Sequence, residues 1–187
     1  MKIAVGVSGG SGAIYTLALL QHLEALGVER HLVASDVGLK VMEHECGVDE
    51  AELRTYCDVW HDNENLGDTL ASGSAKLDGM AIVPCSMKTL AGIACGYSDS
   101  LLLRAADVCI KERRTLVLVV RETPFSPIHL ENMLKLARMG VVILPAAPGF
   151  YNHPQSLSDI VRFMSGKILD QLGLEHDVYK RWNGECD

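Results

Sequence analysis

Charged and aromatic side chains follow two apolar runs of this sequence, at positions where they could take part in chemistry. Arg121 and Glu122 come directly after the run Thr115–Val120, and Tyr151 lies a few residues beyond a second run at 141–145. If both runs are parallel strands, these side chains gather along one edge of a sheet, which is where open α/β sheets bind ligands. The sequence therefore predicts a site that contains a guanidinium, a carboxylate and a phenol.

The segment before the first run predicts a mostly buried helix with one charged stripe. Arg104, Asp107 and Lys111 fall at i, i+3 and i+7, while nearly every other position from 101 to 110 is apolar or small. One interpretation is a surface ladder in which Asp107 pairs with both cations. The other is an anion-binding site.

Length and charge limit the classes of function. The 187 residues suit one domain that can bury a core without disulfides or metals. A formal net charge of −7 argues against broad nucleic-acid binding, which needs a basic face to displace counterions from the phosphates. A small anionic ligand in a local basic pocket is compatible with this charge.

Cysteine and histidine usage predicts neither a disulfide framework nor a metal site. None of the six cysteines forms a C-x-x-C pair, and thiols in apolar or helical contexts pack as small hydrophobes, which favours a reducing cytoplasm. His44 stands between Glu43 and Glu45 and has no H-x-x-x-H partner. The sequence shows no targeting pattern and no apolar run approaching ~18 residues, so no membrane segment is expected.

Five β-rich runs alternate with helix-favouring segments along the chain. The runs cover residues 2–8, 29–34, 77–84, 115–120 and 141–145. Such alternation predicts an α/β fold with a doubly wound parallel sheet in a single domain, for which we expect the bounds 1–174. Residues 61–74 are expected to form a polar loop with a helical turn, and residues 175–187 a tail that could pack on a neighbouring subunit.

A glycine-rich loop, GGSG at residues 9–12, joins the first predicted strand to a helix expected at 13–26. Strand, glycine loop and helix begin a mononucleotide-binding unit, because the backbone N–H groups and the positive end of the helix dipole favour an anion. Such loops also make plain tight turns. Asp36 would suit an NAD ribose, but the glycines do not fit G-x-G-x-x-G, so we prefer a helix-capping role for it alongside Ser35.

Polar groups follow every predicted strand. They are Ser11, Ser35, Ser86, Lys88, Thr89, Arg121, Glu122 and Tyr151, and a helix at 90–96 is expected after the third strand. No Ser-His-Asp, metal or disulfide-exchange set emerges among them, and the lack of a G-x-S-x-G elbow disfavours a hydrolase. Hydroxyls, cations and one carboxylate suit a phosphorylated ligand with a planar polar ring.

Five stretches of the chain resemble one protein family. They are GVSGGSGAIY, LASGS, VPCSMKTLAGI, RAADVCIKERRTLVLVVRETPFSPIHLENMLKL and ILPAAPGFYNHPQSL, of which RAAD-x-x-x-KERR and P-x-PGFY are the most specific. From its first strand to about Trp182 the chain is similar to the UbiX-type flavin prenyltransferases, including the small subunits encoded beside hydroxyaryl and phenylacrylic acid decarboxylases. The resemblance implies a flavodoxin-like fold and a homododecamer with the flavin site between subunits.

The resemblance also implies an activity and its residues. Family members transfer a dimethylallyl group from dimethylallyl phosphate to N5 and C6 of reduced FMN without a metal, and the prenylated FMN serves a UbiD-type decarboxylase. The FMN contacts implied by motif are Gly10, Ser11, Gly12, Ser35, Ser86, Met87, Lys88, Thr89 and Arg121. Those to the isoprenyl phosphate are Arg104, Lys111, Tyr151 and Lys167, with Glu122. Ser11, Glu45 and Glu122 are implied as catalytic, the first two as a proton relay during ring closure.

Three positions depart from the family pattern. Lys167 stands where arginine is usual, which gives a point charge in place of a bidentate fork. The loop at 63–67 carries Leu66 where some members have a tryptophan. Cation–π stabilisation of an allyl cation would therefore come from another aromatic residue, for example Trp182. Gly10 replaces a more usual alanine.

Two other functions are left open by the residues. A non-catalytic accessory subunit would bind FMN and deliver it to a decarboxylase without turnover. An NAD(P)-linked reductase is favoured only by Asp36.

Overall fold

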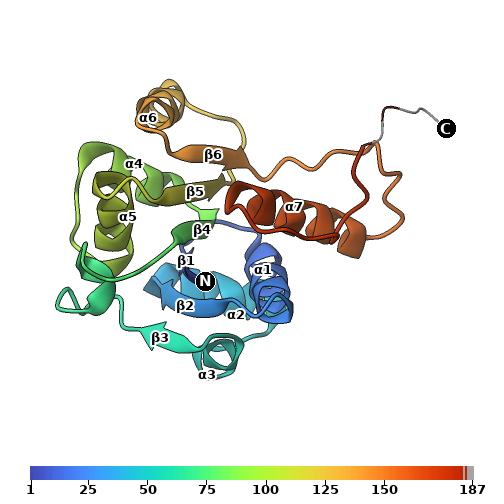
Figure 1. Cartoon of the computed structure of the whole chain (residues 1–187). Helices are drawn as coiled ribbons and strands as arrows, with labels where there is room; N and C mark the ends of the chain where they lie inside the picture. Colours follow the sequence, from blue (N-terminus) through green and yellow to red (C-terminus); the bar gives the residue numbers. More distant parts are fainter. Residues whose placement is uncertain (183, 185–187) are drawn as a thin grey trace.

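A parallel β-sheet forms the centre of the computed structural model, which describes residues 1–182 and 184 (Figure 1). Its hydrogen-bonded neighbours follow the order β3-β2-β1-β4-β5-β6, and all of them are parallel, which confirms the predicted doubly wound sheet. The strands are β1 (Lys2–Val7), β2 (Glu29–Ala34), β3 (Val59–His61), β4 (Gly79–Cys85), β5 (Thr115–Val120) and β6 (Val142–Pro145).

The five predicted strands are confirmed, and β3 was missed. Without β3, the strands lie in the order second, first, third, fourth, fifth, which is the flavodoxin-like arrangement. β3 has three residues and begins before the predicted loop at 61–74, so it is too short to show a period-2 pattern. It forms because the edge of β2 offers it partners, including a contact of 2.9 Å between His31 Nδ1 and His61 Nε2.

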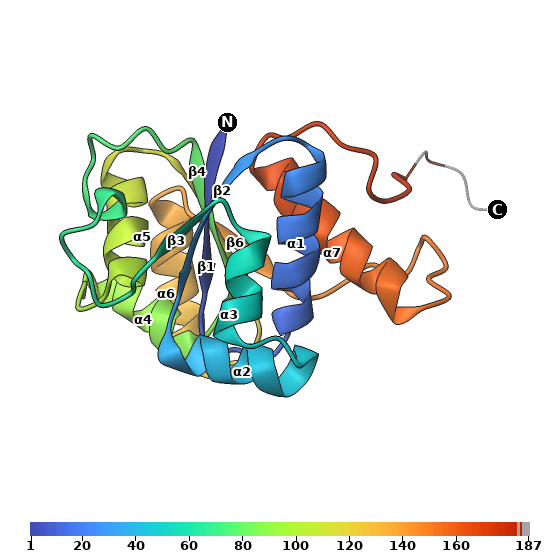
Figure 2. The ribbon, with the colours of Figure 1, turned by 90° about the horizontal axis from the view of Figure 1, so that it is seen from below.

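Helices cover both faces of the sheet (Figure 2). They are α1 (Ala13–Ala25), α2 (Asp36–Cys46), α3 (Glu50–Leu53), α4 (Met87–Cys95), α5 (Leu101–Lys111), α6 (Pro127–Arg138) and α7 (Leu157–Gln171). Side chains of α4, α5 and α6 form one hydrophobic core with the sheet, and those of α1, α2, α3 and α7 form a second. α5 and α7 therefore lie on opposite faces of the sheet.

Burial on both faces explains why the strands read as continuous apolar runs. All seven residues of β4 are buried, as are the last five of β5. A parallel sheet covered by helices on each side leaves no strand face for water, so polar residues are displaced to the strand ends. Among residues 1–182 and 184, no helix is long and apolar enough to cross a membrane.

Serine caps set where several helices begin. A capping box begins α7, with Ser156 and Asp159 bonding each other's backbone N–H groups. The expected start of α4 at residue 90 was wrong, because Ser86 accepts a hydrogen bond from the Thr89 N–H (3.3 Å) and caps the helix three residues earlier. Met87, Lys88 and Thr89 thus form the first helical turn.

Ser8 ties the ends of the two central strands together. Its hydroxyl is buried, donates to the carbonyl oxygen of Pro84 (2.9 Å) and accepts from the Ser86 N–H (2.8 Å). β1 and β4 are neighbours where the strand order reverses, so this hydroxyl fixes the point at which a doubly wound sheet binds its ligand. Sequence analysis missed this role, because Ser8 was counted only as the last residue of a strand.

We expect Ser8→Ala to lower the free energy of unfolding by about 1–3 kcal/mol, because the half-buried Ser86 N–H would lose its partner and the carbonyl oxygen of buried Pro84 would lose a donor. Urea unfolding followed by circular dichroism measures the change. Ser74→Ala is the matched control, because Ser74 is exposed and its hydroxyl contacts only that of Ser72 among the hydrogen bonds described. A loss no larger than that of the control would contradict the assigned role.

Candidate functional site

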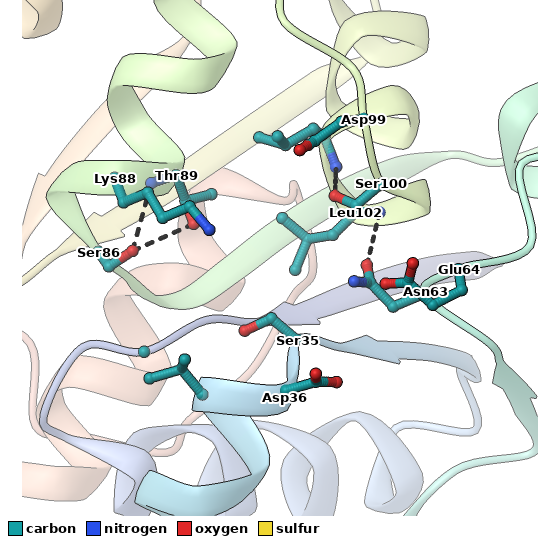
Figure 3. Close-up of a pocket in the computed structure, with 13 residues that line it drawn as sticks. Ser35, Asp36, Asn63, Glu64, Ser86, Lys88, Thr89, Asp99, Ser100 and Leu102 are labelled. Carbon is teal, nitrogen blue, oxygen red and sulfur yellow. Dashed lines mark hydrogen bonds between the residues drawn. The ribbon is translucent and has the colours of Figure 1, made fainter.

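A cavity of about 380 Å³ lies where the strand order reverses (Figure 3). Gly9, just beyond β1, lines it together with the predicted cofactor contacts Ser35, Ser86, Lys88 and Thr89. These residues come from the carboxyl ends of three different strands and from the first turns of the helices that follow. The structure thus brings four of the predicted FMN contacts into one cavity.

Three helices begin at the cavity wall, each capped by a serine that lines the cavity. Ser35, Ser86 and Ser100 cap α2, α4 and α5 by accepting from the N–H groups of residues 38, 89 and 103. The positive ends of three helix dipoles and their first-turn N–H groups therefore surround one space. Such an arrangement favours a phosphate or another anion.

Four polar lining residues were missed by sequence analysis: Asn63, Glu64, Asp99 and Ser100. Ser100 had a local signal, because a serine ahead of an apolar helical stretch is a usual N-cap. Asn63 had none, since its carbonyl and side-chain oxygens accept from Leu101 (2.8 Å) and Leu102 (3.1 Å), far along the chain. Its contacts hold the loop after β3 against the start of α5.

Asp36 lines the cavity and does not cap α2, so the preferred capping role for Asp36 was wrong (Figure 3). Ser35 alone provides the side-chain cap, through its contact of 3.1 Å with the Gly38 N–H. Asp36, Glu64 and Asp99 place carboxylates around the cavity, whereas Lys88 adds a positive charge. The wall therefore carries acceptors as well as donors, as a ligand with both phosphate and hydroxyl groups requires.

Glu45 and Ser11 meet at the glycine loop. The Glu45 carboxylate accepts from the N–H groups of Gly12 (2.8 Å) and Ala13 (2.9 Å), and so caps α1, which has no side-chain cap of its own. Partial burial by itself raises the pKa of Glu45, but hydrogen bonds from Ser11, Gly12 and Ala13 and the charge of Arg121 lower it on balance. Glu45 is therefore ionised at neutral pH beside the Ser11 hydroxyl.

Gly12 takes the backbone conformation on which this loop depends. Its φ of 109° lies in the region that favours glycine, and it lets the chain turn directly into α1. Gly10 packs against the end of β4, where an added Cβ would lie 3.3 Å from Cβ of Pro84. Neither glycine lines the cavity, and both shape the loop that carries Ser11.

Arg121 follows β5 and has an unusual feature. Its Nε atom is buried and has no hydrogen-bond partner among the described residues. Buried guanidinium groups are almost always paired, because an unsatisfied donor costs free energy. An acceptor supplied by a ligand at this sheet edge would satisfy it, which fits the predicted contact with a flavin.

Arg104 and Lys111 do not reach the cavity in this chain. Arg104 contacts Asp107 (2.5 Å) and donates through Nε to the carbonyl oxygen of Ala71 (3.2 Å), while Lys111 pairs with Glu112. The ladder interpretation is right for Arg104 and wrong for Lys111, which pairs with a different acid. Both cations are partly exposed on α5 and can reach a partner outside the chain.

The other two predicted phosphate contacts lie on the opposite face. Lys167 is on α7, where its Nζ is 3.4 Å from Oδ2 of Asp170, and the exposed Tyr151 lies in the loop ahead of α7. Glu122, beyond β5, accepts from the N–H of Thr123 at 3.0 Å. Because α5 and α7 cover different faces (Figure 2), one chain does not bring the four predicted phosphate contacts together.

Comparison with known proteins shows the family of this chain. Residues 1–169 match the family model described as Flavoprotein. A probable UbiX-like flavin prenyltransferase of Streptomyces sp. (strain D7) is 52% identical over 98% of this chain and 92% of its own length. This chain belongs to the UbiX flavin prenyltransferase family. The prediction made from the five sequence stretches is confirmed.

Two solved structures of UbiX proteins superpose on nearly the whole chain. AnUbiX (PadA1), in complex with FMN and dimethylallyl pyrophosphate, has a TM-score of 0.97 and 42% identity, with 98% of each chain covered. A dodecameric FMN-dependent UbiX-like decarboxylase from Escherichia coli O157:H7 has a TM-score of 0.95 and 50% identity, covering 98% of this chain and 100% of that one. The flavodoxin-like UbiX fold is thus established for this chain.

Asp170 lies in a dense polar cluster and contacts Lys167, one of the predicted phosphate contacts. Burial alone raises its pKa, but hydrogen bonds from Arg181 and Tyr179 and the charges of Arg181 and Lys167 lower it on balance to about 2. Burial, together with the hydrogen bond to this carboxylate, raises the pKa of Tyr179 to about 12. The ionised form of Asp170 therefore stabilises the fold.

We expect this stabilisation to be complete above about pH 3.8 and to be lost as the pH falls toward 2, because the folded pKa lies below the unfolded one. The difference in unfolding free energy between wild type and Asp170→Asn should then shrink by about 2 kcal/mol between roughly pH 5 and pH 2. Urea unfolding at several pH values measures it. A difference that is independent of pH would contradict the assigned charge state.

Proposed function

We propose that this protein transfers a dimethylallyl group from an isoprenyl phosphate to N5 and C6 of reduced FMN, and that the prenylated FMN serves a UbiD-type decarboxylase. Its membership of the UbiX family supports the reaction. The structural observation that carries the proposal is the buried Nε of Arg121, which has no partner among the described residues and lies at the sheet edge that also holds the cavity. A fold with that donor unsatisfied calls for a ligand acceptor.

FMN is the acceptor in this reaction, and the residues present fit it. Ser35, Ser86 and Ser100, with their helix N-termini, suit its phosphate, and Lys88 adds a charge. Arg121 offers a donor to a polar ring edge. Bound FMN supplies the nucleophilic N5 and C6 atoms, and the chain supplies orientation and shielding from water.

Ser11 and Glu45 are suited to moving a proton during ring closure. The lowered pKa of Glu45 keeps its carboxylate ionised, so it can accept a proton at neutral pH, and the Ser11 hydroxyl bonded to it can pass one on. Two backbone N–H groups hold the carboxylate in place. Glu122 is proposed as a third catalytic residue, beside Arg121.

We propose that neighbouring copies complete the half of the site that binds the isoprenyl phosphate. Arg104 and Lys111 on α5 cannot join Lys167 and Tyr151 within one chain, so another copy has to supply one of the two sets. The E. coli relative is dodecameric, and here Ile128, Leu130 and Leu134 expose an apolar face on α6 that suits assembly. Cations from two copies would stabilise the leaving phosphate.

Lys167 provides a test of the phosphate half. We expect Lys167→Met to weaken binding of dimethylallyl phosphate by about 1.5–3 kcal/mol, the usual contribution of a charged hydrogen bond. Lys167→Arg should keep activity and bind at least as tightly, because a guanidinium can fork across two phosphate oxygens. The Michaelis constant for dimethylallyl phosphate is the measurement. If Lys167→Met matched wild type, the phosphate would have to rest on Arg104, Lys111 and Tyr151.

One incubation tests the proposed function directly. The protein is mixed anaerobically with reduced FMN and dimethylallyl phosphate, and the flavin is then weighed by mass spectrometry. We expect the flavin mass to rise by one dimethylallyl-derived unit. An accessory subunit or an NAD(P)-linked reductase would instead return FMN of unchanged mass. An unchanged flavin mass therefore overturns the proposal.

We also propose that the protein works in the cytoplasm. All five cysteines among the described residues are free, which suits a reducing compartment.

We further propose that residues 1–174 form the flavoprotein domain and that residues 175–187 form a tail against a neighbouring subunit. In the structure, His176, Tyr179 and Arg181 contact α7 of their own chain. Residues 183 and 185–187 of the tail lie outside the described residues.

A further inference from the structure

The carboxylate of Asp170 accepts hydrogen bonds from four side chains of the described part of the chain. Its Oδ1 accepts from His176 Nε2 (3.1 Å) and Arg181 Nη2 (2.7 Å), and its Oδ2 from the Tyr179 hydroxyl (2.7 Å) and Lys167 Nζ (3.4 Å). Three of these donors belong to residues 175–182, here called the C-terminal strap. The fourth is Lys167, the proposed phosphate contact, so one carboxylate joins the strap to the site.

The strap fits α7 closely at Gly166. An added Cβ there would lie 2.3 Å from Cδ1 of Tyr179 and 3.0 Å from Cε1 of His176, so a larger residue would push the strap away. His176 Nε2 also donates to the carbonyl oxygen of Gly166 (2.9 Å), and its Nδ1 accepts from the Val178 N–H (3.2 Å). With Nδ1 as an acceptor and Nε2 as a donor, His176 is assigned as a neutral imidazole.

The cluster retains positive charge. Among the described residues, Lys167 and Arg181 both contact Asp170, so this group of two cations and one carboxylate carries a net positive charge that an anion can use. The Lys167 contact is the longest of the four, and an ammonium has three hydrogens, so Lys167 can also donate to a phosphate. Asp170 thus fixes the direction of Lys167 without neutralising the site.

Aromatic contacts continue from the strap to Tyr151. Tyr179 packs against Phe163 with ring centroids 5.1 Å apart, and Phe163 packs edge-on against Tyr151 at 5.9 Å. Trp182, at the end of the strap, contacts Tyr151 edge-on at 5.7 Å. Tyr151 is therefore bounded by Phe163 of α7, on which Tyr179 of the strap packs, and by Trp182 of the strap, and edge-to-face pairs fix ring orientation.

We propose that Asp170 is a positioning residue for the isoprenyl phosphate: by holding the strap on α7 it sets the directions of both Lys167 and Tyr151. This inference rests on the proposed function, in which those two residues contact the phosphate. In this proposal Asp170 acts through these residues and not by contact with a substrate. A purely structural role would be limited to stability, whereas a positioning role changes the affinity for one substrate selectively.

The test uses FMN-loaded protein and two measurements on Asp170→Asn. Calorimetry with dimethylallyl phosphate and oxidised FMN measures binding without turnover, and the anaerobic assay measures the Michaelis constants of both substrates. We expect Asp170→Asn to weaken the binding of dimethylallyl phosphate at least about tenfold, with FMN affinity unchanged within about twofold. Asp58→Asn is the matched control, because Asp58 accepts three hydrogen bonds from Arg30 next to β3, the edge strand farthest from β6.

A double-mutant cycle shows whether Asp170 acts through Lys167. Lys167→Met removes the ammonium group that Asp170 is proposed to position. The fold-loss of dimethylallyl phosphate affinity in the double variant should therefore be smaller than the product of the fold-losses in the two single variants. Purely multiplicative losses would overturn the inference. Equal losses for FMN and dimethylallyl phosphate would overturn it as well, and so would an affinity in Asp170→Asn equal to that of the control.

Tyr179→Phe covers the case in which Asp170→Asn does not fold. This change keeps the ring on Gly166 and removes a single donor to Asp170. We expect a smaller loss, confined to dimethylallyl phosphate, and no loss would overturn the inference. Failure of the proposed function is recognised separately, because wild type would then leave the flavin mass unchanged while the calorimetric comparison still reports on positioning.

Discussion

Glu45→Gln slows prenyl transfer by about 10²–10⁴-fold and leaves FMN bound, if Glu45 relays a proton during ring closure. The glutamine oxygen can still accept from the Gly12 and Ala13 N–H groups, so the cap of α1 and the glycine loop stay in place. An amide cannot take up a proton, however, and the Ser11 hydroxyl then has no base beside it. The loss falls on the chemical step because the interaction matters most in the transition state.

Single-turnover mass spectrometry of the flavin measures this rate, and fluorescence titration measures FMN affinity. Glu43→Gln is the matched control, since Glu43 is an exposed carboxylate on the same helix and should keep wild-type turnover. If Glu45 only caps α1, Glu45→Gln should keep wild-type turnover as well. That result would leave Glu45 as a structural cap for α1.

Lys111→Ala and Arg104→Ala each weaken the binding of dimethylallyl phosphate by about 2–5 kcal/mol, roughly 30- to 5,000-fold, while FMN affinity changes little. The reason is that removing one cation from a desolvated anion site leaves the phosphate charge uncompensated. Among the described residues, the ion pairs of these cations are with Asp107 and Glu112, so a surface role would cost modest stability and no substrate affinity. Comparing the melting temperature with the Michaelis constant separates the two cases, and Lys40→Ala on α2 is the control.

Mixed oligomers extend this test to the proposed sharing of the site. Subunits with Lys111→Ala and subunits with Lys167→Met are unfolded together and reassembled in equal amounts. If the two lysines of one site come from different copies, about a quarter of the sites in a random mixture have both of them intact, and tight binding returns in those sites. If both lysines came from one chain, no intact site could form, so an inactive mixture would contradict a shared site.

Much of the fold follows from local features of the sequence. The strands that are buried on both faces appear as apolar runs, because a parallel sheet covered by helices admits no polar face. The serines ahead of α2, α6 and α7 mark helix starts, because a hydroxyl can satisfy a first-turn N–H. β3 was not predictable in this way, since a three-residue edge strand depends on the neighbour that pairs with it.

The sequence by itself determined the family, the parallel sheet and the groups at the strand ends, because these depend on residue type and on spacing along the chain. Only the tertiary structure decided that Glu45 caps α1, that Asn63 joins the cavity wall and that Asp170 holds the strap beside Lys167. It also placed α5 and α7 on opposite faces of the sheet. These facts depend on contacts between distant segments and on which face of a helix meets the sheet, and no spacing within one segment encodes them.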